Sequence, residues 1–176
     1  IINRLSKLLE YLIQNHPEEN WQQYSIQDNI DWEKITVAGH SQGGGHAGFA
    51  SKHFKVDRVI MFAASDWVAG QTADWIRKPG PTPDKSYFGF IHQQDMPAYN
   101  VVMPTWGDYG IFNFGTPVNV DHNEPPFNNT HGLITNLPVP DNIRPHNYII
   151  VDLATPHASD YENYLYSEVW QYLLTA

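Results

Sequence analysis

Ser41 lies in a sequence context that is typical of a nucleophile. The segment Gly39-His40-Ser41-Gln42-Gly43 matches G-x-S-x-G, a pattern in which serine occupies a strained turn from a strand into a helix and exposes its hydroxyl. We therefore predict a positive φ angle at Ser41. The two glycines are expected because a Cβ at either position would collide with neighbouring backbone. The pentapeptide alone would occur by chance in roughly one chain in twenty of this length, so the surrounding elements must support the interpretation.

The chemistry that this motif predicts is nucleophilic attack by a serine hydroxyl. A hydroxyl is a weak nucleophile at neutral pH, so it needs a histidine to take its proton and a carboxylate to orient that histidine. The turn also puts Ser41 at a helix N-terminus, where the backbone N–H of Gln42 can donate to a developing oxyanion. In folds that use this turn, the acid and then the histidine follow the serine along the chain.

Two aspartates follow predicted strands and are candidates for the acid. Asp95 ends the segment YFGFIHQQD, directly after a strand, where side chains project into a site. Asp66, in FAASDW after the preceding strand, is the alternative. Either aspartate could instead cap a turn in a loop, and we favour Asp95 as the acid.

Three of the nine histidines lie late enough in the chain to act as the base. His131 is expected to begin the last strand, which points it away from the required loop. His146 follows that strand by about ten residues, and His157 precedes the final helix. We favour His146 as the base and leave His157 as the alternative. Whichever of the two is not the base is expected to lie on the surface or to cap a helix.

The segments around these residues predict a parallel α/β sheet in a single domain. Short apolar runs are typical of parallel strands that are covered on both faces. They occupy Lys34–Ala38, Asp57–Ala64, Tyr87–His92 and His131–Asn136. A helix rich in small residues is expected over Gln42–His53, and strands that alternate with helices indicate an α/β fold.

Helical spacing of apolar residues predicts one helix at each end of the chain. The opening stripe consists of Ile2, Leu5, Leu9, Leu12 and Ile13, and we expect it to lie against a sheet. The closing stripe consists of Tyr166, Val169, Trp170, Leu173 and Leu174. Residues 95–131 contain five prolines and show no helical or alternating period, so we predict an irregular stretch that forms the wall of a binding site.

Composition excludes several classes of partner and site. The 176 residues include 10 Lys and Arg against 19 Asp and Glu, a net charge of −9 that disfavours binding to nucleic acid or anionic membranes. With no cysteine, the chain can form neither disulfides nor thiolate metal sites, and its redox compartment is not indicated. No apolar stretch is long enough to span a membrane, which predicts a soluble protein. Its localisation stays open, since a signal peptide upstream of the given sequence would make it secreted.

Several of these segments together resemble the serine-esterase branch of the α/β-hydrolase superfamily. They are VAGHSQGGGHA, RVIMFAASDW, YFGFIHQQD and a late histidine before VWQYLL, and the resemblance covers nearly the whole chain. It implies that Ser41 is the nucleophile, Asp95 the acid, His146 the base and the Gln42 backbone one oxyanion donor. It also implies that residues 1–176 form the C-terminal part of an α/β-hydrolase domain, including the nucleophile elbow. The N-terminal strands and the second oxyanion donor are then expected outside this chain.

The sequence therefore predicts a hydrolase of small carboxylic esters that forms an acyl-enzyme on Ser41 and needs no metal or organic cofactor. Another acyl-transfer or peptidase reaction on the same residues is an alternative, as is a non-catalytic binding module with this fold. Metal binding is less well supported, because its candidate ligands match no recognised spacing. Those candidates are His92, Asp95, Asp121 and His122.

Aromatic residues in predicted loops are candidates for the wall of the substrate pocket, although aromatic residues mostly fill cores. They are Trp67, Trp75, Tyr99, Trp106 and Tyr109. The oligomeric state is not indicated by the sequence.

Overall fold

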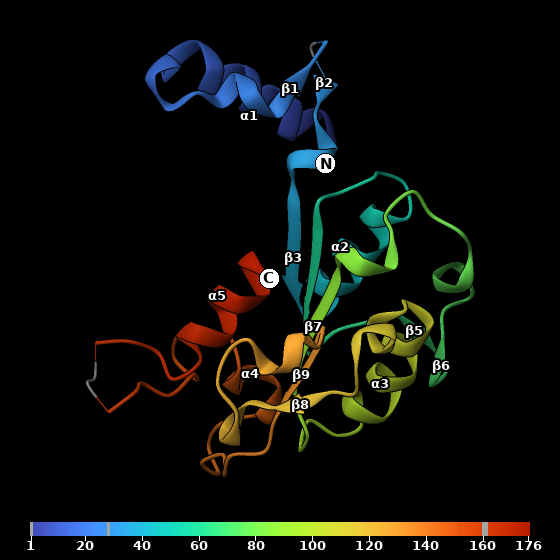
Figure 1. Ribbon diagram of the computed structural model, residues 1–176, viewed down its shortest axis with the longest axis vertical. Coiled ribbons are helices and arrows are strands. Elements are labelled where there is room, and N and C mark those ends of the chain that lie inside the picture. Colours follow the sequence, from blue (N-terminus) through green and yellow to red (C-terminus); the bar gives the residue numbers. More distant parts are fainter. Residues whose placement is uncertain (1, 28, 160–161) are drawn as a thin grey trace.

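The centre of the molecule is a five-stranded sheet in which every neighbouring pair of strands is parallel. A computed structural model describes residues 2–27, 29–159 and 162–176. The strand order is β3-β4-β7-β9-β8 (Figure 1). The sheet strands are β3 Thr36–His40, β4 Arg58–Phe62, β7 Tyr87–His92, β8 Val118–Asn119 and β9 Gly132–Thr135. This arrangement confirms the predicted α/β class and the four predicted strands.

The remaining elements are five α-helices, two short hairpins and several single 3-10 turns within the described residues. The helices are α1 Ile2–Asn15, α2 Gln42–Ser51, α3 Ala98–Asp108, α4 Pro145–Tyr148 and α5 Ser167–Thr175. The hairpins pair β1 Ser25–Ile26 with β2 Asn29–Ile30, and β5 Trp67–Val68 with β6 Gln71–Thr72.

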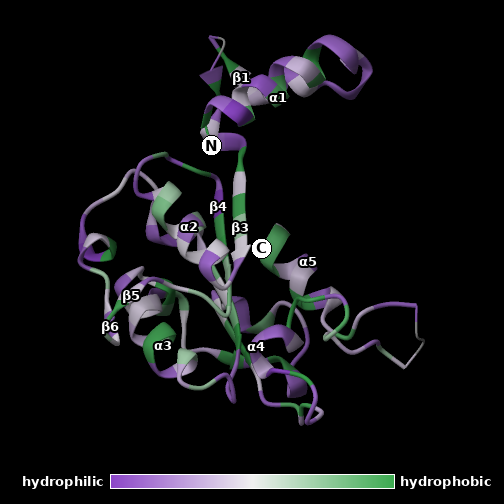
Figure 2. Ribbon diagram, turned by 180° about the vertical axis from the view of Figure 1, so that it is seen from behind, coloured by the Kyte–Doolittle hydropathy of each residue, from purple (hydrophilic) through white to green (hydrophobic). Residues whose placement is uncertain are grey.

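Helices cover both faces of the sheet (Figure 1), and the alternation of side chains along β7 explains how. Tyr87 stacks on Tyr109 at the end of α3, with ring centroids 4.9 Å apart. Phe88 points to the opposite face and meets Tyr172 of α5 edge-on. Because successive side chains of a strand point to opposite faces, α3 packs on one face together with α2, and α5 packs on the other. Hydrophobic residues accordingly lie along the strands in the middle of the sheet, whereas the surrounding loops are largely hydrophilic (Figure 2).

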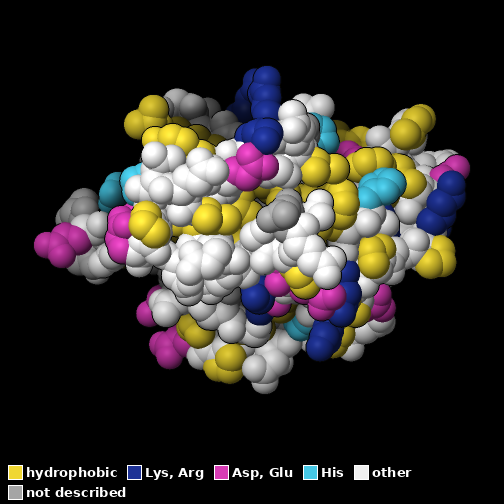
Figure 3. Space-filling view, turned by 90° about the horizontal axis from the view of Figure 1, so that it is seen from above, with side chains coloured by type: hydrophobic (Ala, Val, Ile, Leu, Met, Phe, Trp, Pro, Cys, Tyr) yellow, Lys and Arg dark blue, Asp and Glu magenta, His cyan; other side chains and the backbone are white. Residues whose placement is uncertain are grey.

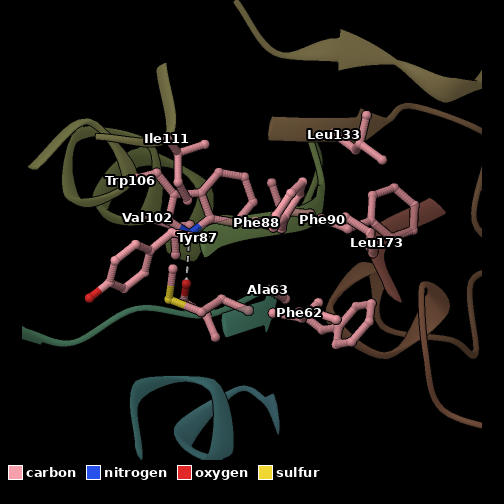
Figure 4. Packing of buried hydrophobic residues seen from close by; sticks show 14 of the residues in the cluster. Phe62, Ala63, Tyr87, Phe88, Phe90, Val102, Trp106, Ile111, Leu133 and Leu173 are labelled. Carbon is pink, nitrogen blue, oxygen red and sulfur yellow. Dashed lines mark hydrogen bonds between the residues drawn. The ribbon is translucent and has the colours of Figure 1, made fainter. Parts of the chain in front are cut away.

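The prediction for residues 95–131 was wrong, because this stretch contains α3 and β8. Val102 and Trp106 are fully buried, so α3 has an apolar face. Pro104 lies inside the helix and has no N–H to donate, and it obscures the helical pattern in the sequence. Trp106 fills the space above Gly89 of β7 and donates its indole N–H to the Ala64 carbonyl at 2.9 Å (Figure 4). Two of the residues expected in a loop are thus part of the core, since Tyr109 is buried as well.

The predicted helices at the two ends exist, but their apolar residues are placed differently from expectation. In α5, Leu173 is fully buried, whereas Leu174 is exposed and Tyr172 takes its place in the core. Tyr172 also donates its hydroxyl to the Thr130 carbonyl at 2.8 Å, which a leucine could not do. One face of α5 therefore combines apolar packing with a buried hydrogen bond.

The apolar stripe of α1 does not lie on the main sheet, contrary to expectation. It faces a local cluster that includes Trp21, Tyr24 and Ile30, and Leu9 is buried there. Figure 1 shows α1 and the β1–β2 hairpin beyond the amino-terminal end of β3.

On the face seen in Figure 3, Lys and Arg side chains form separate small groups among acidic and hydrophobic ones. No helix in the described part of the chain has the length and apolar character needed to cross a membrane.

The turn between β3 and α2 has the geometry that the motif predicts. Ser41 has φ 55° and ψ −126°, between the last residue of β3 and the first residue of α2. Its backbone N–H donates to the Phe62 carbonyl of β4 at 3.0 Å, which ties the turn to the sheet. The positive φ angle at Ser41 is thus confirmed.

The two glycines of the motif are required unequally. A Cβ on Gly39 would lie 2.2 Å from the backbone carbon of Gly43, so only glycine fits there. A Cβ on Gly43 would meet nothing within 4 Å, and the expectation that Gly43 is also needed sterically was wrong. Gly44 is the second constrained position, because a Cβ there would lie 2.3 Å from the Ala64 side chain and 2.7 Å from the Gly39 carbonyl oxygen.

We predict that Gly39→Ala lowers the free energy of unfolding by about 2 kcal/mol or more, since backbone must shift to admit the methyl group. Gly43→Ala is the matched control in the same turn. It should leave the free energy of unfolding unchanged or raise it by up to about 1 kcal/mol, because alanine favours helix. Urea unfolding of both variants measures the difference. Equal destabilisation by the two substitutions would contradict this account of the turn.

Candidate active site

Asp95 and His146 are 51 positions apart in the sequence and are joined by a hydrogen bond. His146 Nδ1 lies 2.6 Å from Asp95 Oδ2, and since an ionised carboxylate only accepts, the imidazole N–H donates. Asp95 is buried in the loop after β7, where its backbone N–H donates to the His92 carbonyl. His146 lies in α4 and is partly exposed. This bond leaves His146 Nε2 as the nitrogen that can accept a proton.

His40 connects His146 to the turn that carries Ser41. His40 Nε2 lies 2.8 Å from the backbone carbonyl oxygen of His146, and the two rings are 4.5 Å apart. A carbonyl only accepts, so His40 Nε2 carries the proton. Burial lowers the pKa of His40, and the hydrogen bond to His146 partly offsets that effect. His40 is therefore favoured as a neutral donor that holds the backbone of His146 beside the turn.

Ser41 and Gln42 form one side of a pocket of about 280 Å³. Its other lining residues are Ala63, Ser65, Asp66 and Trp67. Gln42 is the first residue of α2, so its N–H has no carbonyl partner within the helix and is free for an acceptor in the pocket. Within the described residues, the Ser41 hydroxyl makes no hydrogen bond to His146. Hydrogen bonds of this kind are often long without substrate and tighten when it binds.

Asp66, the alternative acid, lies in this pocket and makes no hydrogen bond to His146 within the described chain. Burial raises the pKa of its carboxyl group, and the nearby His46 opposes that effect. The two candidate aspartates are thus separated: Asp95 contacts the histidine, and Asp66 lines the pocket of Ser41.

Comparisons with protein-family models, with curated proteins and with solved structures found no significant match. Any function for this chain must therefore be inferred from its own residues.

The other late histidines have different surroundings. His131 lies between the rings of Phe88 and Phe114, each 4.0 Å away, and its Nδ1 donates to the Tyr87 carbonyl at 3.0 Å. It is half-buried between these rings and, within the described residues, makes no contact with the site, as expected of a histidine that points away from it. His157 stacks on the Tyr164 ring at 4.6 Å in the segment before α5.

Three of the four residues considered as metal ligands, His92, Asp95 and Asp121, hydrogen-bond to other groups. His92 Nε2 donates to the Leu137 carbonyl, and its Nδ1 accepts from the Gln94 backbone. Asp121 accepts from the Thr135 hydroxyl and the Asn136 backbone. Among the described residues, a different group has its ligand atoms within 4.8 Å of one another, close enough to share a metal ion. It lies after the end of α1 and consists of His16, Glu18 and Glu19.

Reasoning from the sequence missed His40 as part of this site, because the motif leaves its second position unrestricted. It also missed Ser65, which lies next to the alternative acid and lines the pocket. Of the aromatic residues expected in the pocket wall, Trp67 lines the pocket of Ser41.

One buried and two half-buried histidines predict that stability falls on acidification. Burial lowers the pKa values of His40, His92 and His131 below the value of about 6.5 that they regain on unfolding. As the pH falls from about 7 to 5, the unfolded chain takes up protons that the folded chain binds less readily, so the free energy of unfolding decreases. Urea unfolding across this range should show the decline, and His131→Phe should make it shallower. A free energy of unfolding that is flat from pH 7 to 5 would contradict the burial of these groups.

Proposed function

We propose that this protein is a serine-dependent carboxylic ester hydrolase with an α/β-hydrolase arrangement, in which Ser41, Asp95 and His146 form the catalytic triad. The observation that carries the proposal is the hydrogen bond of 2.6 Å between His146 Nδ1 and Asp95 Oδ2. It orients the ring and fixes the tautomer that a general base needs. The strained turn at Ser41 supports the same interpretation, since it exposes the hydroxyl at a helix N-terminus.

The topology supports the proposal independently. Ser41 follows β3, Asp95 follows β7, and His146 follows β9. These strands are parallel, so their carboxyl ends lie at one edge of the sheet, where open α/β sheets bind ligands. The chain order of nucleophile, acid and histidine is the one found in α/β-hydrolases.

The proposed reaction has two halves. In the first, Ser41 Oγ attacks the ester carbonyl carbon while its proton passes to His146 Nε2, and the Gln42 N–H donates to the oxyanion. The bond to the alcohol then breaks, and the alcohol leaves with the proton from His146. In the second half, water attacks the acyl-enzyme, and the same histidine takes and returns a proton as the carboxylic acid is released. Asp95 stays ionised and stabilises the imidazolium that forms in each half.

A fluorophosphonate probe and short activated esters test this function on the full-length protein. We expect covalent labelling at Ser41, which mass spectrometry of the labelled peptide would locate. Ser41→Ala should abolish labelling, and the kcat of ester hydrolysis should fall roughly 10³-fold or more, because binding and the oxyanion donors alone remain. His146→Ala should lose activity as well, whereas His157→Ala is the control and should keep it. A folded protein that is not labelled, and that matches its Ser41→Ala variant on every ester, would favour a non-catalytic binding module.

His40 provides a further test, since it holds the backbone of His146. His40→Ala removes the hydrogen bond to the His146 carbonyl, and we expect kcat/KM to fall roughly tenfold through a poorly positioned base. His40→Gln is the matched variant, because its side-chain amide N–H can still donate, and it should retain more of the activity. Ester hydrolysis by the three proteins, with circular dichroism as a check on folding, gives the comparison. Unchanged kcat/KM in His40→Ala would remove this role.

A further inference from the structure

Asp66 is an acidic residue in the lining of the pocket of Ser41 that the proposed triad does not use. Within the described residues the Asp66 side chain forms no hydrogen bond and no ion pair. The backbone carbonyl of Asp66 does accept a hydrogen bond, from the Ala73 N–H. Its Oδ1 atom lies so close to α2 that a Cβ on Gly45 would be 2.4 Å from it. His46 is near enough to affect the carboxyl group but lies beyond ion-pair distance.

A negative charge at this position opposes the proposed chemistry unless something neutralises it. The same pocket holds Ser41 and the Gln42 N–H, where an oxyanion would develop. Like charges that are close together in a partly desolvated site repel. An ester with a positively charged group would bring the neutralising charge with it.

The rest of the pocket suits a cation. Trp67 lines it, the residue is 40% exposed, and the face of an indole ring attracts cations. Ser65 lines it as well; the residue is 4% exposed, and its hydroxyl has no partner within the described chain. Buried polar groups without a partner are uncommon in native structures. The net charge of −9 also attracts cations toward the protein.

We propose that the pocket formed by Ser41, Asp66 and Trp67 selects esters that carry a positively charged ammonium group, with Asp66 as the residue that binds the charge. This inference rests on the proposed hydrolase function and names its substrate class. Trp67 contributes the face of its ring to the same cation.

Acetylcholine and its uncharged isostere, 3,3-dimethylbutyl acetate, test the charge preference with nearly equal shapes. We expect the full-length protein to have a kcat/KM at least roughly tenfold higher for acetylcholine, a ratio typical of one charge-assisted contact. In Asp66→Asn, the ratio of kcat/KM for acetylcholine to kcat/KM for the uncharged ester should fall roughly tenfold. A fall in this ratio separates a charge-binding role from a loss of structure, which would lower kcat/KM for both esters alike.

Two further measurements keep the inference testable without depending on turnover alone. Trp67→Ala changes a residue outside the buried core and should reduce the preference for the cationic ester. Tetramethylammonium should bind the unmodified protein, as observed by NMR titration, and should bind Asp66→Asn several-fold more weakly.

The outcomes distinguish the two proposals. Hydrolysis of both esters at equal kcat/KM, with Ser41 labelled by fluorophosphonate, would overturn the cation site and leave the hydrolase function standing. Binding of tetramethylammonium that depends on Asp66, without labelling of Ser41, would support the cation site and overturn the hydrolase function. If neither binding nor a charge preference is seen, the cation site is overturned.

Discussion

The close approach of β3 to α2 is the constraint on which the rest of the site depends. Gly39 and Gly44 permit it, because a side chain at either position would meet backbone or the Ala64 side chain at less than van der Waals distance. The chain must reverse within one residue, so Ser41 takes a φ angle that residues with a Cβ rarely adopt. The same turn puts Ser41 in the wall of the pocket and leaves the Gln42 N–H without a carbonyl partner in α2. It directly follows His40, which donates to the backbone of His146. Strain at one residue therefore sets the positions of several functional groups.

The sheet brings the remaining groups to that turn. Asp95 lies in the loop after β7, and His146 lies in α4, which follows β9. Parallel pairing through β4 puts the carboxyl ends of β7 and β9 at the same edge of the sheet as the end of β3. A rigid interior supports them. Tyr87 and Trp106 pack on one face of the sheet, and Phe88 and Phe90 pack on the other, so the strands that carry the loops have little room to shift (Figure 4).

Much of this arrangement could be predicted from the sequence, because the signals were local. Apolar runs predicted the four longer strands, and a five-residue motif predicted the turn at Ser41. The contact between Asp95 and His146 is long-range, and it could be anticipated only as a choice among a few residues that follow strands. The helix α3 was missed because Pro104 breaks the pattern that Val102 and Trp106 would otherwise show. The burial of Tyr172 depends on a partner 42 positions away, the Thr130 carbonyl, which helical periodicity does not reveal.

The indole of Trp106 joins two regions that are otherwise separate. Its ring lies over Gly89 of the central strand, and its N–H donates to the Ala64 carbonyl, one residue before Ser65. Because the residue is fully buried, its indole proton can exchange with solvent only when α3 opens away from the sheet. The exchange of that single proton therefore reports local opening beneath the pocket wall, whereas the exposed Trp67 in the same wall reports only contact with solvent or ligand. The protein thus contains a pair of internal probes, one for the support of the site and one for its occupancy.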